Sequence, residues 1–443
     1  MRGFLEYQKG TLTSNLPIPN GHWDERSNCY RAKALYYRDI VEYLKESDIE
    51  FEDEVFNLPP MEFFETSQMK LRDYQQEALD KWMRDKKGVL VLPTGAGKTN
   101  IGIKAIEMAR VQTLVVVPTI ELISQWKRKI KDILGVDAGE FYGETHEIKG
   151  ITISTYDSAY LRAEELGNRF LLVMFDEVHH LPSQSYSMIA EMFASPFRMG
   201  LTATYEREDM LHRELDRLIG GKIYEVKLEK LKGKHLADYE VKRIRIDLTD
   251  EESVEYNENY LFYTNFLRKH NIRMGRDSFK RFIFVASRGE EGRKAILSRN
   301  RAREIAMNSE AKIEALRKII KEHREDRMII FTELNSLVYR ISKEFLMPAI
   351  TYQTPSKERE ELMNFFRKGD YERIVTSRVL EEGIDVPEAS VGVIVSGSGS
   401  VRQYRQRLGR ILRKKEDKKA MLYEIVSNKT LELGSVRKRH RRG

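Results

Sequence analysis

The chain has 443 residues, of which 41% are hydrophobic and 33% are charged, a composition that supports two to four folded domains with ionic surfaces. No apolar stretch is long enough to span a bilayer, and the N-terminus lacks the apolar core of a signal peptide. The single cysteine, Cys29, excludes an intrachain disulfide bond and a cysteine-based metal site. We therefore expect a soluble cytoplasmic protein.

The net charge of +7 is distributed unevenly along the chain. Residues 267–304 contain twelve Lys or Arg residues against four Asp or Glu residues, whereas residues 1–66 carry an acidic excess. A polyanionic partner is therefore expected at the middle of the chain and not at its start. The alternative for the basic stretch is a solvated surface.

The first 66 residues are predicted to form a small α+β domain. Phe4–Thr13 resembles a strand, residues 29–46 have the apolar spacing of an amphipathic helix, and Ile49–Phe56 alternates apolar and acidic residues like a half-exposed strand. Leu58-Pro59-Pro60 then interrupts the chain and leads into a linker.

A different pattern begins near residue 68, where short apolar runs alternate with helical stretches. The runs lack polar alternation, which is typical of strands buried on both faces of a parallel sheet. This order predicts a doubly wound α/β domain, which we place at residues 67–247. The runs are Gly88–Leu92, Thr113–Val117, Ile151–Ser154, Phe170–Phe175 and Met199–Thr202.

The same pattern returns in the second half of the chain and predicts a second α/β domain at residues 307–443. Between the two domains, residues 250–306 are predicted to be almost entirely helical and are basic. The apolar runs of the second domain are Met328–Phe331, Ala349–Tyr352, Arg373–Thr376 and Val391–Val395.

The segment Pro93-Thr94-Gly95-Ala96-Gly97-Lys98-Thr99 follows an apolar strand and opens a helix. Glycines in such a loop let backbone N–H groups face a phosphate, and the helix N-terminus adds its positive dipole end. Lys98 can reach the β- and γ-phosphates of ATP, and the Thr99 hydroxyl can bind Mg²⁺. Leu92 stands where the strict pattern has a glycine. The alternative is a glycine-rich turn with a solvated lysine.

The apolar run Phe170–Phe175 leads directly into Asp176-Glu177-Val178-His179-His180. Carboxylates at the carboxyl ends of parallel strands lie where ligands bind in such sheets. Asp176 is expected to hold Mg²⁺ through its water shell, and Glu177 to orient and deprotonate the attacking water. The alternative is an acidic cap at a helix N-terminus. The two histidines have no third ligand nearby in the sequence, so zinc is not expected.

Asp176-Glu177-Val178-His179 resembles the DExH box of superfamily 2 helicases, and the phosphate-binding loop resembles the helicase variant in which Gly95 makes the turn. This resemblance implies two tandem RecA-like domains that use ATP and Mg²⁺. The other segments that resemble motifs of this superfamily, in the correct order, are Leu71-Arg72-Asp73-Tyr74-Gln75, Val117-Pro118-Thr119 with Gln125-Trp126, Ile153-Ser154-Thr155-Tyr156, Leu201-Thr202-Ala203-Thr204, Ile330-Phe331-Thr332, Glu382-Gly383-Ile384-Asp385-Val386-Pro387 and Gln403 through Arg413.

Within that superfamily the chain resembles the xeroderma pigmentosum group B (XPB) branch over residues 68–415. Arg207-Glu208-Asp209 is similar to its RED motif, residues 250–306 to its thumb insertion, and Tyr352 through Arg359 to a segment of its second domain. Residues 1–66 match the damage-recognition domain of this family in position only. The chain lacks the long extensions of eukaryotic members, so an archaeal or bacterial form is expected.

The resemblance implies roles that the residue patterns alone do not assign. Arg410 and Arg413 are expected to reach the ATP phosphates from the second domain as arginine fingers, and Gln406 to sense the γ-phosphate. Gly383 would approach that phosphate through its backbone, and Asp385 would hold the ribose.

The other expected site residues fall into an ATP-binding set, in which Gln75 faces the adenine, and a DNA-side or coupling set. The ATP-binding set on the first domain is Arg72, Gln75, Pro93, Thr94, Gly95, Ala96, Gly97, Lys98 and Thr99. The DNA-side or coupling set is Thr119, Thr155, Thr202, Thr204, Arg207, Glu208, Asp209, Arg273, Arg276, Lys280 and Arg281. Phe282 and Phe284 are expected to be core residues and not stacking platforms, because helical neighbours two apart do not share a face and so cannot form one platform.

We therefore predict an ATP-dependent DNA helicase or translocase, 3′→5′ by resemblance, that acts in nucleotide excision repair or in promoter-type duplex opening. The expected substrate is duplex DNA with single-strand or fork character, contacted mainly through phosphates. We expect a monomer that works with a repair nuclease or a transcription/repair factor. Two alternatives stay open: an RNA-directed DExH motor, because no motif distinguishes the sugar, and a DNA-binding repair scaffold in which ATP acts only as a clamp.

Overall fold

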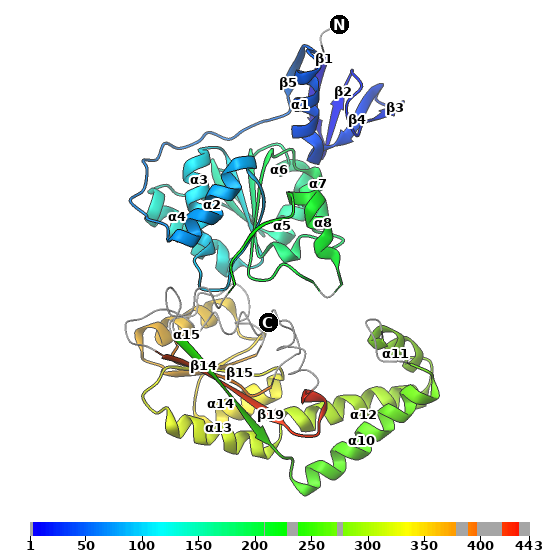
Figure 1. Ribbon diagram of the computed structural model, residues 1–443, viewed down its shortest axis with the longest axis vertical. Coiled ribbons are helices and arrows are strands. Elements are labelled where there is room, and N and C mark those ends of the chain that lie inside the picture. Colours follow the sequence, from blue (N-terminus) through cyan, green and yellow to red (C-terminus); the bar gives the residue numbers. More distant parts are fainter. Residues whose placement is uncertain are drawn as a thin grey trace. The chain divides into compact units, whose positions relative to one another are not determined.

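The computed structural model describes residues 3–207, 209–227, 238–272, 278–377, 389–396 and 419–433. The chain divides into two compact units, with the division close to residue 231 (Figure 1). The first unit contains the N-terminal domain and one large sheet, and the second contains another sheet and a helical insertion. No helix in the described part of the chain is both long and apolar enough to cross a bilayer.

The N-terminal domain is a five-stranded sheet in the order β3-β4-β2-β1-β5, packed against helix α1 (Tyr37–Glu46). The predicted strand Phe4–Thr13 is a hairpin, because Lys9 and Gly10 have left-handed backbone angles that turn the chain. The predicted helix begins only at Tyr37, because Cys29–Lys33 pair with β2 as a strand and Ala34–Tyr36 form a 3₁₀ turn. The strands are β1 (Gly3–Gln8), β2 (Thr11–Ser14), β3 (His22–Asp24), β4 (Cys29–Lys33) and β5 (Phe51–Glu54).

The N-terminal domain is attached to the neighbouring α/β domain by specific contacts within the first unit. The Tyr7 hydroxyl donates a hydrogen bond to the Met192 carbonyl at 3.1 Å, and Lys33 pairs with Glu191 at 2.7 Å. Ala194 packs into the apolar core of the N-terminal domain. The two parts therefore share a continuous interface.

The large sheet of the first unit has eight strands in the order β13-β6-β12-β11-β7-β10-β8-β9, parallel except for the β8–β9 pair. Its central strands are fully buried, as their unbroken apolar sequences predict. The strands are β6 (Lys87–Val91), β7 (Thr113–Val117), β8 (Gly139–Tyr142), β9 (Thr145–His146), β10 (Ile151–Thr155), β11 (Leu172–Asp176), β12 (Phe197–Thr202) and β13 (Lys222–Glu225).

Helices follow most of these strands and cover the sheet, as in a doubly wound fold. They are α2 (Asp73–Asp85), α3 (Lys98–Ala109), α4 (Ile120–Leu134), α5 (Tyr156–Leu161), α6 (Ala163–Leu166), α7 (Ser187–Met192) and α8 (Glu214–Ile219), with short 3₁₀ turns at Val178–His180 and Leu211–Arg213.

The sheet of the second unit has six parallel strands in the order β14-β19-β18-β15-β17-β16. Strand β14 (Asp238–Ile246) pairs with β19, so these residues, placed above in the first α/β domain, belong to the second sheet. The other elements are β15 (Met328–Phe331), β16 (Ala349–Ile350), β17 (Arg373–Thr376), β18 (Val391–Ile394), β19 (Lys419–Ser427), α13 (Glu310–Glu322), α14 (Asn335–Phe345) and α15 (Ser356–Lys368).

The helical insertion consists of α10 (Asp250–Lys269), α11 (Ser278–Ala286) and α12 (Glu290–Met307). Helices α10 and α12 pack side by side as an arm, and α11 lies at its far end (Figure 1). Thr249 and Glu252 form a capping box that starts α10. The sequence pattern predicted this helical segment, and the structure gives it two long helices and one short one.

Candidate ATP site and nucleic-acid interface

The phosphate-binding loop lies between the buried strand β6 and helix α3, which begins at Lys98. Gly95 and Gly97 have φ angles of 82° and 76°, a left-handed conformation that glycine adopts without steric cost. A Cβ atom at Gly97 would also lie 2.4 Å from the Gln75 amide nitrogen. Both the turn and the close approach of Gln75 therefore need a glycine at position 97.

The Q-type segment at the start of α2 is hydrogen-bonded to this loop. The Gln75 amide donates to the Ala96 carbonyl at 2.7 Å, and the Tyr74 hydroxyl donates to the same carbonyl at 3.0 Å. The Gln75 side-chain oxygen accepts a hydrogen bond from the Arg72 backbone N–H at 2.9 Å. Arg72 and Gln75, predicted to bind the nucleotide, are thus held beside the loop that would carry its phosphates.

Asp176 is the last residue of β11 and is buried. Its carboxylate accepts hydrogen bonds from the Trp126 indole N–H and from the Glu177 backbone N–H, both at 3.0 Å. Tyr156 donates to its backbone carbonyl at 3.1 Å. Burial and the neighbouring charge of Glu177 raise the pKa of the Asp176 carboxyl.

Glu177 adopts a left-handed backbone conformation, with φ of 48°, which is uncommon for a residue other than glycine. Its carboxylate lies 3.8 Å from the Lys98 ammonium and 3.4 Å from the His179 ring. Burial opposes its ionisation, but the charge of Lys98 and the hydrogen bond to His179 outweigh burial and lower its pKa. An ionised Glu177 is the form that can accept a proton from water.

The residues expected to hold Mg²⁺ fit that ion in their chemistry. An ionised carboxylate has about four acceptor positions, and Asp176 uses two of them for the N–H groups of Trp126 and Glu177. Thr99 lies in the first turn of α3, beside the loop. Mg²⁺ is commonly bound by one or two carboxylates together with substrate phosphates and waters. Within the described ranges, no group of three or more His, Cys, Asp or Glu side chains could form a separate metal site.

The threonines predicted to lie on the DNA side follow the same edge of the sheet. Thr202, at the end of β12, donates to Glu177 at 3.4 Å and lies 3.0 Å from the His179 ring. Thr155 caps α5 by accepting the Ser158 N–H. The hydroxyls of Thr94, Thr119 and Thr204 are buried without a hydrogen-bond partner among the described residues. Unpaired buried hydroxyls are costly, so their presence at one sheet edge is typical of a ligand-binding edge.

Arg207 connects the segment that resembles the RED motif to the DExH box. Its guanidinium donates one hydrogen bond to the His179 carbonyl and two to the Asp209 carboxylate, the latter at 2.9 and 2.6 Å. These contacts with Arg207 lower the pKa of Asp209 to about 2. The sequence suggested only that this cluster lies near the ATP and DNA motifs, whereas the structure joins it directly to the DExH box.

Several expected site residues lie outside the described residues. They are Glu208, Arg273, Arg276, Gly383, Asp385, Gln406, Arg410 and Arg413.

Helix α11 carries the other two predicted DNA-side residues, Lys280 and Arg281, which are both exposed. Phe282 is buried in the core of the insertion, as predicted. Phe284 is 58% exposed, so its prediction as a core residue is wrong. The helix buries only the face that contains Phe282 and Ala286, and Phe284 lies on the other side.

Sequence reasoning did not single out Trp126, Tyr156 and Arg198 as important side chains. The first two lie in segments that resemble helicase motifs, but their hydrogen bonds to Asp176 arise from tertiary structure. Arg198 is buried at the start of β12 and donates hydrogen bonds to four backbone carbonyls. The only sign of this role in the sequence is that a charged residue, Arg198, stands directly before the apolar run Met199–Thr202. Burial lowers its pKa to about 9.

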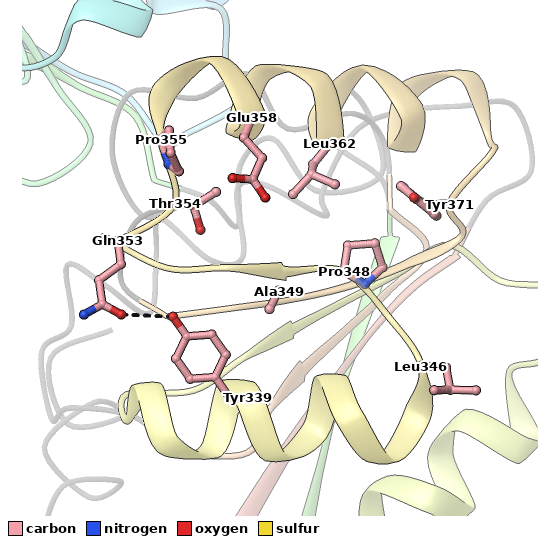
Figure 2. A pocket seen from close by; sticks show the side chains of 10 residues that line it. All are labelled: Tyr339, Leu346, Pro348, Ala349, Gln353, Thr354, Pro355, Glu358, Leu362 and Tyr371. Carbon is pink, nitrogen blue, oxygen red and sulfur yellow. Dashed lines mark hydrogen bonds between the residues drawn. The ribbon is translucent and has the colours of Figure 1, made fainter.

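A pocket of about 570 Å³ lies in the second unit between α14, β16 and α15 (Figure 2). Thr354 and Pro355, from the segment that resembles part of the XPB family, contribute to its wall. Tyr339 donates a hydrogen bond to Gln353 at 3.1 Å along one side. The pocket contains none of the residues predicted to bind ATP. The candidate ATP site therefore consists of the loop and the carboxylates of the first unit and does not include this cavity.

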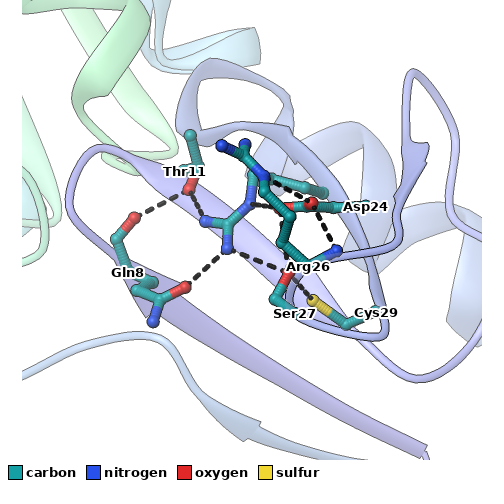
Figure 3. A network of polar contacts seen from close by, with 7 residues as sticks. Gln8, Thr11, Asp24, Arg26, Ser27 and Cys29 are labelled. Carbon is teal, nitrogen blue, oxygen red and sulfur yellow. Dashed lines mark hydrogen bonds and ion pairs between the residues drawn. The ribbon is translucent and has the colours of Figure 1, made fainter.

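The N-terminal domain contains a polar network centred on Arg31 (Figure 3). The Arg31 guanidinium donates to Thr11 and Gln8, each at 2.7 Å, and to Asp24 at 3.2 Å. The hydrogen bond from Ser27, followed by contacts with Arg26 and Arg31, lowers the pKa of Asp24 to about 2. This network ties the β3–β4 hairpin to the β1–β2 hairpin and has a structural role.

Comparisons with known proteins match the same three regions. The model of the xeroderma pigmentosum group B helicase damage recognition domain matches residues 5–55. The models of the type III restriction enzyme res subunit and of the helicase conserved C-terminal domain match residues 68–207 and 311–415. The helicase domain of Pyrococcus furiosus Hef has a similar fold, with a TM-score of 0.53 at 18% identity over 82% of this chain and 97% of that one.

Several curated relatives carry XPB names, and three of them show the range of similarity. The DNA 3'-5' translocase XPB2 of Sulfurisphaera tokodaii is 45% identical over 98% of this chain and 99% of that protein. The DNA 3'-5' helicase XPB of Mycobacterium tuberculosis is 32% identical over 82% of this chain and 62% of that protein. The transcription and DNA repair factor IIH subunit XPB of Drosophila melanogaster is 29% identical over 84% of this chain and 46% of that protein.

Two largely parallel sheets, one of them with the candidate phosphate-binding loop and the DExH box at its carboxyl edge, together with the two matching family models, place the chain among the two-domain helicases of superfamily 2. The N-terminal match to the damage recognition domain and the 45% identity to the archaeal translocase over nearly the full length of both chains identify the family within this superfamily. The chain belongs to the XPB family.

Proposed function

We propose that this chain is an ATP-dependent 3′→5′ DNA translocase and helicase that acts in DNA repair or in duplex opening. The observation that carries the proposal is the convergence of Lys98, Asp176 and Glu177 at one edge of the first sheet, directly beside the phosphate-binding loop. Phosphoryl transfer depends on positioning and charge neutralisation more than on covalent chemistry, and this group of side chains supplies both.

Each side chain has a defined task in ATP hydrolysis. Lys98 and the backbone N–H groups at the start of α3 bind the phosphates. Asp176 and Thr99 would hold Mg²⁺, which would supply positive charge to neutralise the phosphates. Glu177, kept ionised by Lys98 and His179, orients the attacking water and accepts its proton. Gln75, which is hydrogen-bonded to the loop, reads the adenine base in this proposal.

The second α/β domain completes this site in the proposal. Arg410 and Arg413, by resemblance, stabilise the charge that develops on the phosphates during transfer. Because these residues and the phosphate-binding loop belong to different domains, ATP binding draws the domains together and hydrolysis releases them. The cycle moves the DNA-contacting surfaces of the two domains relative to each other, which gives translocation.

The test is the rate of ATP hydrolysis by the full chain with duplex DNA, single-stranded DNA, damaged duplex and RNA, measured side by side. We expect turnover to be stimulated by DNA and not by RNA. Stimulation by RNA alone would favour an RNA-directed motor. Tight DNA binding without steady-state turnover would favour a scaffold in which ATP is a clamp. Displacement of a third strand from a triplex, compared with unwinding of a fork, separates translocation from strand separation.

The setting of this activity is also a proposal. We propose a monomer that works at DNA in the cytoplasm with a repair nuclease or a transcription/repair factor as its partner. The relative from Drosophila melanogaster is named as a subunit of a general transcription and DNA repair factor, which supports a partner of that kind. Co-purification of the full chain from its own cells, followed by identification of bound proteins, tests this proposal.

A further inference from the structure

Helix α11 presents an apolar surface to solvent at the end of the helical arm. Its exposed apolar residues are Phe279, Ile283 and Phe284, which are 50%, 37% and 58% exposed, and together they form what we call the α11 platform. The helix is anchored by Phe282 and Ala286, which are buried in the core of the insertion. The helical repeat places Phe279 beside this buried side, where the centre of its ring lies 6.2 Å from that of Phe282, and Phe284 on the far side. The helix is thus fixed on one side and leaves the side chains of Phe279 and Phe284 about half exposed.

Two guanidinium groups lie over these exposed rings. The Arg288 guanidinium carbon is 4.1 Å from the centre of the Phe284 ring, and that of Arg299 is 4.6 Å from the centre of the Phe279 ring. Such cation–π pairs hold flat, positively charged groups against flat apolar ones. The result is a pair of layered surfaces, each with a ring and a guanidinium plane.

The surroundings of the platform are strongly basic. Residues 278–303 contain eight Lys or Arg residues against two Asp or Glu residues. Lys280 and Arg281 belong to α11 itself and are exposed. A partner that offers flat apolar groups connected by negative charges complements this surface, and a nucleic-acid strand whose bases are unpaired has that chemistry. Paired bases inside a duplex do not expose their faces.

We propose that the α11 platform stacks the bases of an unpaired DNA strand, while the basic residues around it contact the phosphates. This proposal rests on the proposed DNA-directed function and names the form of DNA that this surface selects. Stacking on aromatic rings tolerates every base, so the contact needs no sequence specificity. It would retain a strand once the duplex has opened.

The arm that carries the platform is fixed to the second sheet by polar contacts at its base. Arg303 of α12 pairs with Glu333, which follows β15, at 2.5 Å. The Tyr256 hydroxyl of α10 accepts a hydrogen bond from the Leu431 N–H at 3.0 Å, and Ser427 donates to the Ala306 carbonyl at 2.7 Å. The platform therefore moves with the second domain, and a strand stacked on it would be carried through the ATP cycle.

The decisive experiment compares the full chain with the double variants Phe279→Leu/Phe284→Leu and Phe279→Tyr/Phe284→Tyr. Leucine keeps an apolar side chain but removes the ring, whereas tyrosine keeps the ring. Binding is followed by anisotropy of an oligothymidylate and by fluorescence of a 2-aminopurine placed within it, which is quenched when it stacks. The matched control is Leu261→Ala, which removes an exposed apolar side chain from α10, outside the platform.

We expect the leucine variant to bind the single strand about 10-fold more weakly and to lose the fluorescence quenching, and the tyrosine variant and the control to resemble the unchanged chain. The salt dependence of binding should be preserved in the leucine variant, because stacking releases no counterions. Thermal melts check that each variant is folded. If the double leucine variant has a lowered melting temperature, the two single leucine variants are tested instead.

Two outcomes would overturn the proposal. Unchanged single-strand affinity and quenching in the leucine variant would show that the rings do not stack bases. A protein partner would then be the better candidate for this surface. An equal loss of affinity for blunt duplex and single strand would show that the platform does not select unpaired bases. Failure of the proposed function is distinct, because it would appear as an absence of DNA-stimulated ATP hydrolysis in the unchanged chain.

Discussion

Lys98 and Glu177 carry opposite charges 3.8 Å apart at the expected position of the triphosphate and the attacking water. This pairing keeps the glutamate ionised before ATP binds, and an incoming phosphate would compete with the carboxylate for the ammonium group. The two side chains thus have separate tasks that two substitutions can distinguish.

Lys98→Ala should reduce ATP turnover by about 100-fold to 1000-fold, because it removes a charge that stabilises the transition state. Glu177→Gln should reduce turnover to a similar degree but preserve ATP binding, because the phosphate contacts remain. Steady-state hydrolysis and equilibrium binding of a labelled nucleotide measure the two effects. Turnover close to that of the unchanged chain in either variant contradicts the assigned role.

Trp126 provides a test of the electrostatics at Asp176. Its indole N–H stabilises the ionised carboxylate and so lowers the pKa of Asp176, against the larger effect of burial. Trp126→Phe removes this donor, so the pKa of Asp176 should rise further. If ionised Asp176 is needed for Mg²⁺, the acid limb of the pH–rate profile should move to higher pH in the variant. An acid limb that stays in place or moves to lower pH would show that this hydrogen bond does not control the rate.

At the scale of secondary-structure elements, strands buried on both faces were predictable from their unbroken apolar sequences, whereas β8, β9, β13, β14 and β19 were not predicted. The N-terminal hairpin was missed because Lys9-Gly10 is a short turn inside a run with strand composition. The assignment of β14 to the second sheet depends on its pairing with β19, which is almost two hundred residues away and leaves no local signal. Phe284 was misplaced because sequence spacing does not reveal which face of α11 is covered.

The segment after β12 links two elements through Arg207, whose guanidinium holds both the His179 carbonyl and Asp209. Arg207→Ala should therefore reduce duplex unwinding more than it reduces ATP hydrolysis, so that fewer base pairs open per ATP consumed. Both rates should be measured on one preparation, with a thermal melt as the control. Equal loss of both activities, or unwinding at the original level, would leave this cluster without a coupling role.

The basic residues of the helical insertion are predicted to contact DNA phosphates. Replacement of Arg273, Arg276, Lys280 and Arg281 by alanine should weaken duplex binding and flatten the dependence of log K on log salt by about 0.9 for each lost contact. Titrations at several salt concentrations measure the slope. The exposed pair Lys318 and Lys321 of α13 offers a matched control, because their loss changes the net charge but not the insertion. A slope unchanged by the four substitutions would identify them as solvated surface residues.

At the scale of the whole molecule, the proposed cycle requires that each α/β domain contribute to one ATP site. Arg410→Ala should lower turnover with little loss of ATP affinity, since an arginine finger acts mainly on the transition state. Single-turnover kinetics and nucleotide binding separate the two effects. A parallel fall in affinity and rate would make this residue a ground-state ligand and would weaken the proposal of domain closure.

The positions of the candidate phosphate-binding loop and of the two carboxylates on the first domain were predictable from sequence, because they follow directly on apolar strands. The hydrogen bonds from Trp126 and Tyr156 to Asp176 were not, because they join segments that are far apart in the chain. The same holds for the contacts between the N-terminal domain and α7, which involve a tyrosine with no distinctive sequence signal.

The attachment of the helical arm to the second sheet has a mechanical consequence. Helix α12 has 18 residues, so the arm is a stiff lever of about 27 Å. A rotation of about 10° around its base would sweep the far end through roughly 5 Å, a step similar to the rise of about 3.4 Å between successive nucleotides of one strand. A small angular change in the domain would thus be converted into a stroke of molecular dimensions, and the length of the lever would set the size of the stroke.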